Sequence, residues 1–349
     1  MAGSVVTTPQ PAPEAGPAAS VRPPQWRKPQ RHTYGAVDLG TNNCRLLIAR
    51  PTDEGFTVVD AFSRIVRLGE GLSQSGKLTQ DAMDRAVAAL AVCADKLRRR
   101  HVSLSRSVAT EACRRAVNGR EFVERVRRET DIALEIIAPE EEARLAVLGC
   151  HKLLEPGDGP ALIFDIGGGS TELVLVEPGD SGPRIRAWWS APWGVVSLTE
   201  SEGRAAIEGD DRLAAYERMR GRARESVARF AQMLPSKAKG IRLLGTSGTV
   251  TTLASVHLAL PSYDRKQVDG LHVPIGDMRR ISTMIAEMDF GERSSVPCIG
   301  AERADLVVAG CAILEAILDI WPAENLGIAD RGIREGILRS LMARDGHVL

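Results

Sequence analysis

Two short glycine-bearing loops, each preceded by an apolar run that ends in an aspartate, constrain this chain more than any other feature. The first reads AVDLGTNN at residues 36–43, and the second reads LIFDIGGGST at residues 162–171. A further apolar run follows each loop, at 45–49 and 172–176, so both patterns predict a strand, a tight glycine turn and a second strand. Backbone N–H groups in such turns bind phosphate oxygens, and an aspartate at a strand end can hold hydrated Mg²⁺.

The order of predicted elements around the first loop is repeated around the second. A hairpin at 35–50 precedes a helix at 79–100, and a hairpin at 161–176 precedes a helix at 211–234. A third glycine loop, GTSGT at 245–249, follows a predicted strand. No GxGxxG opens a helix and no GxxxxGK[ST] occurs, so the pattern favours a duplicated α/β lobe over a Rossmann unit. Two such lobes would clamp a phosphate chain between them.

The remaining elements complete this alternation. Further strands are expected at 57–61, 63–68, 105–109, 133–137, 184–190, 194–198 and 241–244. Further helices are expected at 121–130, 140–154, 277–287 and 301–321, and one begins at Val250. Thr79 is the expected N-cap of the helix at 79–100.

Composition indicates a soluble globular protein. The 349 residues suit two domains, and the chain is 44% apolar and 26% charged. The 45 basic and 45 acidic residues cancel, so no global field recruits a nucleic acid or an anionic membrane. No apolar stretch reaches the length of a membrane span. We therefore expect no membrane partner and no specific nucleic-acid partner.

The first 33 residues differ from the rest of the chain. They are rich in proline and alanine and lack the apolar segment of a secretory signal, which is typical of a disordered tail; a transit peptide is the alternative. The six cysteines form no CxxC pair. We expect them to be buried, reduced thiols, as in a cytoplasmic protein.

Three other polar segments allow two interpretations each. Glu140–Glu142 can compensate a helix dipole, or supply a carboxylate that takes a proton from an attacking water. Arg114 and Arg115 can be solvated, or one of them can clamp an anion. Residues 330–336 can be a charged helix start capped by Asp330, or a phosphate-facing one. The glycine hairpins themselves can be purely structural. We assign no role to the six histidines and expect Trp188 and Trp189 to serve packing.

Taken together, the motifs resemble the exopolyphosphatase / guanosine pentaphosphate phosphohydrolase family. The matching segments run in order from Tyr34 to Arg339 and include AVDLGTNNCRLLIAR, ATEACRRAVN, EEEARLAVLG, FDIGGGSTELVL, LLGTSGTVTTLA and ADRGIREGIL. The resemblance implies two ribonuclease-H-like lobes of the actin/sugar-kinase/heat-shock ATPase superfamily, with a cleft between them. It assigns 34–145 and 325–349 to the first lobe and 146–324 to the second.

The resemblance also implies a reaction and a set of site residues. The reaction is Mg²⁺-dependent release of terminal phosphate from inorganic polyphosphate, or of the 5′-phosphate from guanosine pentaphosphate. Glu142 is implied as the catalytic base and Arg114 as the substrate clamp, with Asp38, Asp165 and Glu172 at the metal. The implied substrate-binding residues are Gly40, Thr41, Asn42, Gly167, Gly168, Gly169, Ser170, Thr171, Gly245, Ser247 and Gly248.

Two departures and two rival functions accompany this prediction. Asn43 stands where many family members have serine, and the chain looks like the short, two-lobe form without a helical extension. A homodimer is compatible with the resemblance. The first rival is an actin-like regulator that binds a nucleotide or alarmone without strong hydrolase activity, and the second is a sugar or acetate kinase. A phosphate-release assay separates all three.

Overall fold

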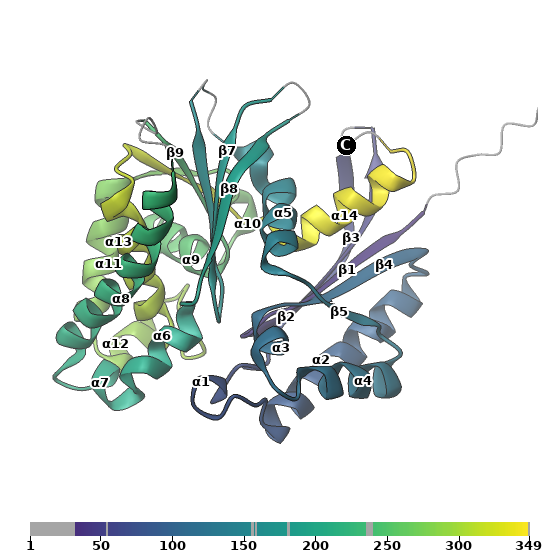
Figure 1. Cartoon of the computed structure of the whole chain (residues 1–349), viewed down its shortest axis with the longest axis horizontal. Coiled ribbons are helices and arrows are strands. Elements are labelled where there is room, and N and C mark those ends of the chain that lie inside the picture. Colours follow the sequence, from purple (N-terminus) through teal and green to yellow (C-terminus); the bar gives the residue numbers. More distant parts are fainter. Residues whose placement is uncertain are drawn as a thin grey trace, which may run out of the picture. The chain divides into compact units, whose positions relative to one another are not determined.

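A computed structural model of the protein describes residues 32–53, 55–154, 157, 159–179, 182–234 and 240–347. The predicted tail lies outside the described residues, except for His32 and Thr33. Thr33 belongs to the fold, because its side chain is buried and its carbonyl accepts the N–H of Ser103 at 2.8 Å. From His32 onward the chain forms one unit, built on two separate β-sheets (Figure 1).

The first sheet has the strand order β3-β2-β1-β4-β5. Its strands are β1 (Tyr34–Leu39), β2 (Asn43–Thr52), β3 (Gly55–Ile65), β4 (Leu104–Ala109) and β5 (Leu134–Ile136). β1 is antiparallel to β2 and parallel to β4. The predicted first hairpin is therefore confirmed. The strands predicted at 57–61 and 63–68 are instead one strand, β3, which ends at Ile65, so residues 66–68 lie outside it.

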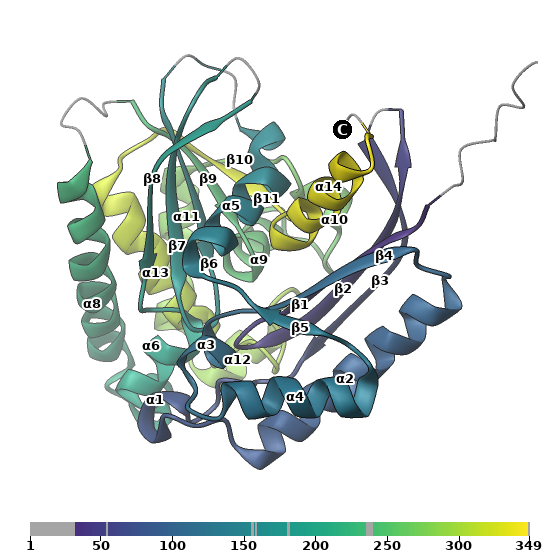
Figure 2. The same cartoon turned by 45° about the vertical axis from the view of Figure 1, so that its right-hand side comes forward.

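Both faces of the first sheet are covered, as Figure 2 shows. Because side chains alternate along a strand, Val37 and Leu39 pack on one face with helices α2 (Gln80–Arg99) and α4 (Gly119–Thr130). Ala36 points to the opposite face and packs with α14 (Ile333–Arg344). Thr79 caps α2 as predicted, since its Oγ1 accepts the N–H of Ala82 at 3.3 Å.

The second sheet repeats this plan and adds one strand, in the order β10-β11-β9-β6-β7-β8. Again a strand, β6, is antiparallel to its hairpin partner and parallel to its other neighbour. The strands are β6 (Ala161–Ile166), β7 (Thr171–Glu177), β8 (Arg184–Ala191), β9 (Arg242–Thr246), β10 (His272–Pro274) and β11 (Asn325–Ala329). The large apolar core packs one face of this sheet against α8 (Arg212–Met233), α9 (Gly248–His257), α11 (Ile275–Glu287) and α13 (Val307–Ile320).

Two helices connect the sheets. The chain passes from β5 to β6 through α5 (Pro139–Cys150), and from β11 to α14, which packs back on the first sheet. The two helices cross in backbone contact, because a Cβ at Gly149 would lie 2.0 Å from the carbonyl oxygen of Gly332, and one at Gly336 would lie 2.0 Å from that of Leu145. Glycine is required at both positions.

Short helices fill the connections, and several of them depart from the predicted pattern. They are α1 (Leu72–Ser75), α3 (Glu111–Arg115), the 3₁₀ turn η1 (His151–Leu153), α6 (Val195–Glu202), α7 (Arg204–Glu208), α10 (Arg265–Val268) and α12 (Phe290–Ser295). The strand predicted at 194–198 is wrong: this segment starts α6, since the N–H groups of Val195 and Val196 bond to carbonyls of the second glycine loop. The helix predicted from 301 begins at Val307.

The sheet order also corrects part of the predicted domain division. Residues 325–349 were assigned to the first lobe, but β11 pairs with β9 and β10 in the second sheet. Only α14 packs on the first sheet, so the return to the first lobe comes after β11. All six cysteines are buried and unbridged, as predicted. Among the described residues, no helix combines the length and the apolar character needed to cross a lipid bilayer.

Candidate active site

A cavity of about 150 Å³ lies where the glycine loops of the two lobes meet. The third loop and the residues before α14 complete its wall. Most of the predicted site residues line it: Asp38, Gly40, Thr41, Asn42, Glu142, Asp165, Gly167, Gly168, Gly169, Ser170, Glu172, Ser247 and Gly248. Arg114, Thr171 and Gly245 do not line this cavity. The two hairpins predicted from sequence therefore converge on a single site.

Strand alternation explains why the acidic residues point into this cavity. Asp38 shares the face of β1 that carries Ala36 toward α14, and Asp165 shares the face of β6 that carries Ile163 toward α5. Glu172 is the direct cross-strand partner of Asp165. Glu142 comes from the first turn of α5 and is only 6% exposed. Four carboxylates from four elements thus line the same cavity.

The first glycine loop has buried oxygens without a partner. Its backbone is anchored, because the carbonyl of Thr41 accepts the N–H of Gly69 at 2.9 Å and that of Asn42 accepts the N–H of Val66 at 2.8 Å. In the part of the chain that the structure describes, Asp38 Oδ1, Thr41 Oγ1 and Asn42 Oδ1 are buried and make no hydrogen bond. Such atoms are costly unless a ligand or cation satisfies them.

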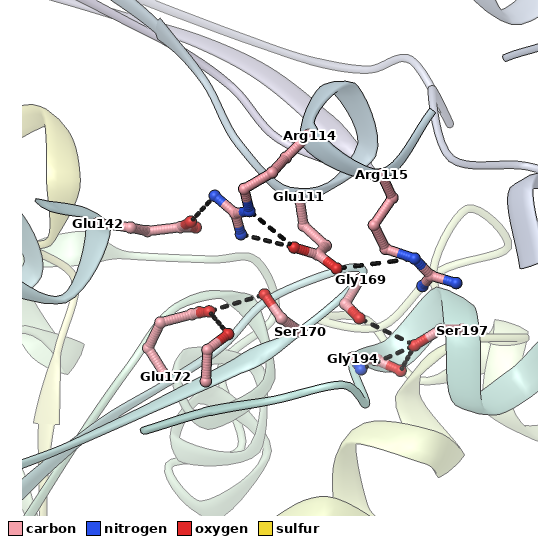
Figure 3. Close-up of polar contacts among 10 residues, drawn as sticks. Glu111, Arg114, Arg115, Glu142, Gly169, Ser170, Glu172, Gly194 and Ser197 are labelled. Atoms are coloured by element: carbon pink, nitrogen blue, oxygen red, sulfur yellow. Dashed lines mark hydrogen bonds and ion pairs between the residues drawn. The ribbon is translucent and has the colours of Figure 1, made fainter. Parts of the chain in front are cut away.

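The second glycine loop is satisfied internally and packs closely on the first. Ser170 donates a hydrogen bond to Glu172 Oε1 at 2.7 Å (Figure 3), and Ser190 of β8 donates to the same oxygen at 2.9 Å. A Cβ at Gly168 would lie 2.9 Å from Thr41 Cβ, so only glycine allows this approach between the lobes. Elsewhere across the interface, Arg67 Nη1 pairs with Asp305 Oδ2 at 3.0 Å.

Burial disfavours the ionised form of these carboxylates and so raises their pKa values. It raises the pKa of Asp165 to about 6, and together with the charge of Asp165 it raises the pKa of Glu172 to about 7. Burial also raises the pKa of Glu142 well above its ordinary value; Glu172 adds to this rise and Arg114 opposes it. The pKa of Asp38 is raised by burial, and Arg45 and Arg334 oppose that rise.

The donor set fits a hard divalent cation such as Mg²⁺, which prefers oxygen ligands and relieves repulsion among buried carboxylates. The unpartnered Asp38 Oδ1 is one such oxygen. The described residues contain no group of three or more His, Cys, Asp or Glu side chains able to share one ion.

Arg114, the predicted substrate clamp, is not among the residues that line the cavity. Its guanidinium bridges two carboxylates of the chain, with Nη2 at 2.6 Å from Glu111 Oε2 and Nη1 at 3.2 Å from Glu142 Oε2 (Figure 3). Nη1 also donates to the carbonyl of Ile137 at 2.7 Å. Arg115 is more exposed and lies 3.8 Å from the other oxygen of Glu111. In this structure Arg114 therefore contacts Glu142 rather than the cavity.

The cations that line the cavity are four other arginines: Arg45, Arg303, Arg331 and Arg334. Arg331 pairs with Asp269 at 2.7 Å and Arg303 donates to Thr252 Oγ1 at 3.0 Å. Within the described ranges, the side chains of Arg45 and Arg334 make neither a hydrogen bond nor an ion pair, although both lie near enough to Asp38 to lower its pKa. The phosphate-facing interpretation of residues 330–336 agrees with their place in the wall, whereas sequence reasoning missed Arg45 and Arg303. A charged residue that interrupts the apolar run of β2 was the available signal for Arg45.

The two sheets and the cavity between their glycine loops define a two-lobed protein of the actin-like class. Known proteins agree. The model of the Ppx/GppA phosphatase family matches residues 47–345. Exopolyphosphatase 2 of Mycobacterium tuberculosis is 30% identical over 322 residues, which cover 88% of this chain and 97% of the relative. The crystal structure of a Ppx/GppA family member from Aquifex aeolicus is 29% identical, with a TM-score of 0.74, and the match covers 91% of this chain and 99% of that one.

An exopolyphosphatase structure from Cytophaga hutchinsonii has a TM-score of 0.79 at 24% identity over 91% of this chain and 99% of that one, which supports the fold alone. The chain belongs to the Ppx/GppA phosphatase family. The predicted superfamily fold and the predicted class of enzyme, a hydrolase acting on phosphoric anhydrides, are thereby confirmed.

Proposed function

We propose that this protein is an exopolyphosphatase, which hydrolyses the terminal phosphoryl group of inorganic polyphosphate. The observation that carries the proposal is the convergence of a buried glutamate, Glu142, and two unpaired arginines, Arg45 and Arg334, on one cavity. Arginines hold phosphate oxygens, and a carboxylate that lines the same cavity is a candidate general base for an attacking water. The name of the Mycobacterium tuberculosis relative supports the same substrate.

In the proposed reaction, water attacks the terminal phosphorus in line with the bridging oxygen, and Glu142 takes a proton from that water. The bond from the terminal phosphorus to the bridging oxygen breaks, and the shortened chain leaves. N–H groups of the glycine loops, with Arg45 and Arg334, orient the terminal and neighbouring phosphates. Gly168 packs directly on the first loop, which holds the two glycine loops close together around the substrate.

Asp38, Asp165 and Glu172 would hold Mg²⁺, directly or through its waters. When bound, the ion neutralises charge on the transferred phosphoryl group. The raised pKa values of Asp165 and Glu172 support this assignment, because a bound cation favours their ionised forms. We keep guanosine pentaphosphate as a second candidate substrate, since its 5′-phosphate presents the same anhydride chemistry to the cavity.

The decisive experiment measures phosphate released from polyphosphate, and from guanosine pentaphosphate, by the purified protein with and without Mg²⁺. Glu142→Gln should lower kcat by about 10²–10⁴-fold while leaving polyphosphate binding nearly unchanged, because only the general base is lost. Near-normal turnover in this variant would remove Glu142 from the mechanism. Binding of either compound without any phosphate release by the wild type would favour the regulator instead.

Two further predictions stay untested. We propose that the protein acts in the cytoplasm, which the six unbridged cysteines support. A homodimer is the other prediction, and the molar mass in solution decides it.

A further inference from the structure

Glu111 is the first residue of α3, and its side chain is 14% exposed at the wall of the cavity. Its carboxylate is engaged on both oxygens. Oε2 accepts hydrogen bonds from Arg114 Nε and Nη2, at 3.1 and 2.6 Å, and Oε1 lies 3.8 Å from Arg115 Nε. Two hydrogen bonds from one guanidinium fix the direction of Arg114, which a single bond would not do.

The far side of the Arg114 guanidinium faces the general base of the proposed mechanism. Nη1 donates to Glu142 Oε2 at 3.2 Å and to the carbonyl of Ile137 at 2.7 Å. Four of the five guanidinium N–H groups are therefore used by the chain itself. No second bidentate site remains for a phosphate, so Arg114 acts here on Glu142, and Glu111 holds Arg114 in that place.

Glu111 also meets the opposite lobe. A Cβ at Gly169 would lie 2.9 Å from Glu111 Cγ and 2.7 Å from Thr41 Oγ1, so the backbone of the second glycine loop rests against the methylene groups of Glu111. Ser197 donates to the carbonyl of Gly169 at 3.1 Å, which ties this loop to α6 (Figure 3). One glutamate thus touches the second lobe with its stem and the arginine with its carboxylate.

We propose that Glu111 is a positioning residue that couples closure of the second lobe to the placement of the general base, through Arg114. The proposal rests on the proposed function. Seating of Gly169 against Glu111 limits the rotamers of Glu111, and the bidentate contact then fixes Arg114 beside Glu142. Without Glu111, Arg114 retains only its contacts with Ile137 and Glu142 and moves more freely.

The test compares Glu111→Ala with the wild type in phosphate release from polyphosphate. We expect kcat to fall about 10- to 100-fold, as for a misplaced catalytic group, while KM changes less than about twofold. Glu111→Gln keeps the length and one acceptor oxygen, so it should recover part of the lost kcat. The matched control is Glu140→Ala, which removes an exposed glutamate near the start of α5 and should leave both constants unchanged.

A double substitution shows whether Glu111 acts through Arg114. In an Arg114→Ala background, Glu111→Ala should lower kcat by less than about twofold, because there is no guanidinium left to position. An equal loss in both backgrounds would overturn the proposal. So would a lower KM at unchanged kcat, since Glu111 would then compete with substrate phosphate for Arg114.

Four of these proteins separate failure of this proposal from failure of the proposed function: the wild type, Glu111→Ala, Arg114→Ala and the double variant. A wild type that releases no phosphate from polyphosphate or guanosine pentaphosphate disproves the hydrolase. Thermal unfolding without substrate then decides the positioning role: coupling between the two substitutions supports the contact, and strict additivity of their effects overturns it.

Discussion

In the first hairpin the strand-end aspartate, Asp38, lies directly opposite Arg45, whereas in the second hairpin the equivalent aspartate, Asp165, lies opposite Glu172. The two pairs occupy the same place in the same motif, seven positions apart in each case (38 to 45 and 165 to 172). A duplicated scaffold therefore presents opposite charges at matching points. In the proposed function, the first lobe offers the Arg45 guanidinium to phosphate, and the second lobe offers the Asp165 and Glu172 carboxylates to a cation.

The two loops differ in the same sense. The first carries three buried oxygens without partners, and the second satisfies the carboxylate of Glu172 with two serine hydroxyls. Polar groups that are hydrogen-bonded within the protein make a site rigid, whereas buried polar groups without a partner are costly unless a ligand binds them. We infer that the second loop is preorganised and that the first is completed by what binds.

Reversing the charge of the first pair tests this comparison most severely. Arg45→Glu would give the first hairpin the acidic pair of the second and should lower kcat/KM about 100- to 1000-fold, mainly through KM. A charge-assisted phosphate contact contributes about 1.5–3 kcal/mol, and the added repulsion increases the loss. Steady-state phosphate release measures it. Arg64→Glu, on the exposed side of β3, serves as the control, and a comparable loss there would mean that only global charge matters.

Asp165→Asn tests the acidic pair through stability. Because burial raises the pKa of Asp165 from 3.8 to about 6 and that of Glu172 from 4.5 to about 7, each carboxylate costs stability as pH rises through that window. At pH 8 without Mg²⁺, Asp165→Asn should stabilise the protein by up to about 3 kcal/mol, and near pH 3 the difference should vanish.

Mg²⁺ should raise the melting temperature of the wild type at pH 8 and have a weaker effect on Asp165→Asn, because binding to the folded state stabilises it. Asp53→Asn, at an exposed position, controls for the loss of one surface charge. An identical Mg²⁺ response in wild type and Asp165→Asn would count against metal binding at the second hairpin.

The smallest effects compare the two loops directly. Thr41→Val removes an unpartnered hydroxyl, so it should raise KM about 3- to 10-fold without lowering the melting temperature. Ser170→Ala removes a donor to Glu172, so it should raise the pKa of that carboxyl further and weaken the Mg²⁺ response. If both variants changed KM alike and left the Mg²⁺ response intact, the contrast between the loops would be lost.

The sequence pattern predicted those elements that are determined by residues close together in the chain. The apolar alternation around Asp38 and Asp165 gave both hairpins, and the same alternation places both aspartates in the cavity. The strand predicted at 194–198 was wrong. Its Val-Val pair favours a strand, but hydrogen bonds to the carbonyls of Gly167 and Gly168 start a helix there.

The remaining site residues could not be predicted from sequence, because they are positioned by contacts with residues far away in the chain. Arg303 lies in turns before α13, and its partner Thr252 is 51 positions away, so no short motif marks it. The position of Arg114 depends on Glu142, which is 28 positions further along the chain. Such pairings follow from the packing of the lobes, which spacing along the chain does not encode.

The backbone contact between α5 and α14 joins the two lobes at one helix crossing. Both passages of the chain between the sheets meet at this crossing, where Gly149 and Gly336 leave no room for even a methyl group. Because the helices touch through their backbones, neither can move closer to the other at this point without a clash. We infer that any opening of the lobes pivots near this crossing, and that closing brings Gly169 back against Glu111. Alanine at Gly149 would push α5 and α14 apart and displace the proposed general base, Glu142, which Gly149 does not touch.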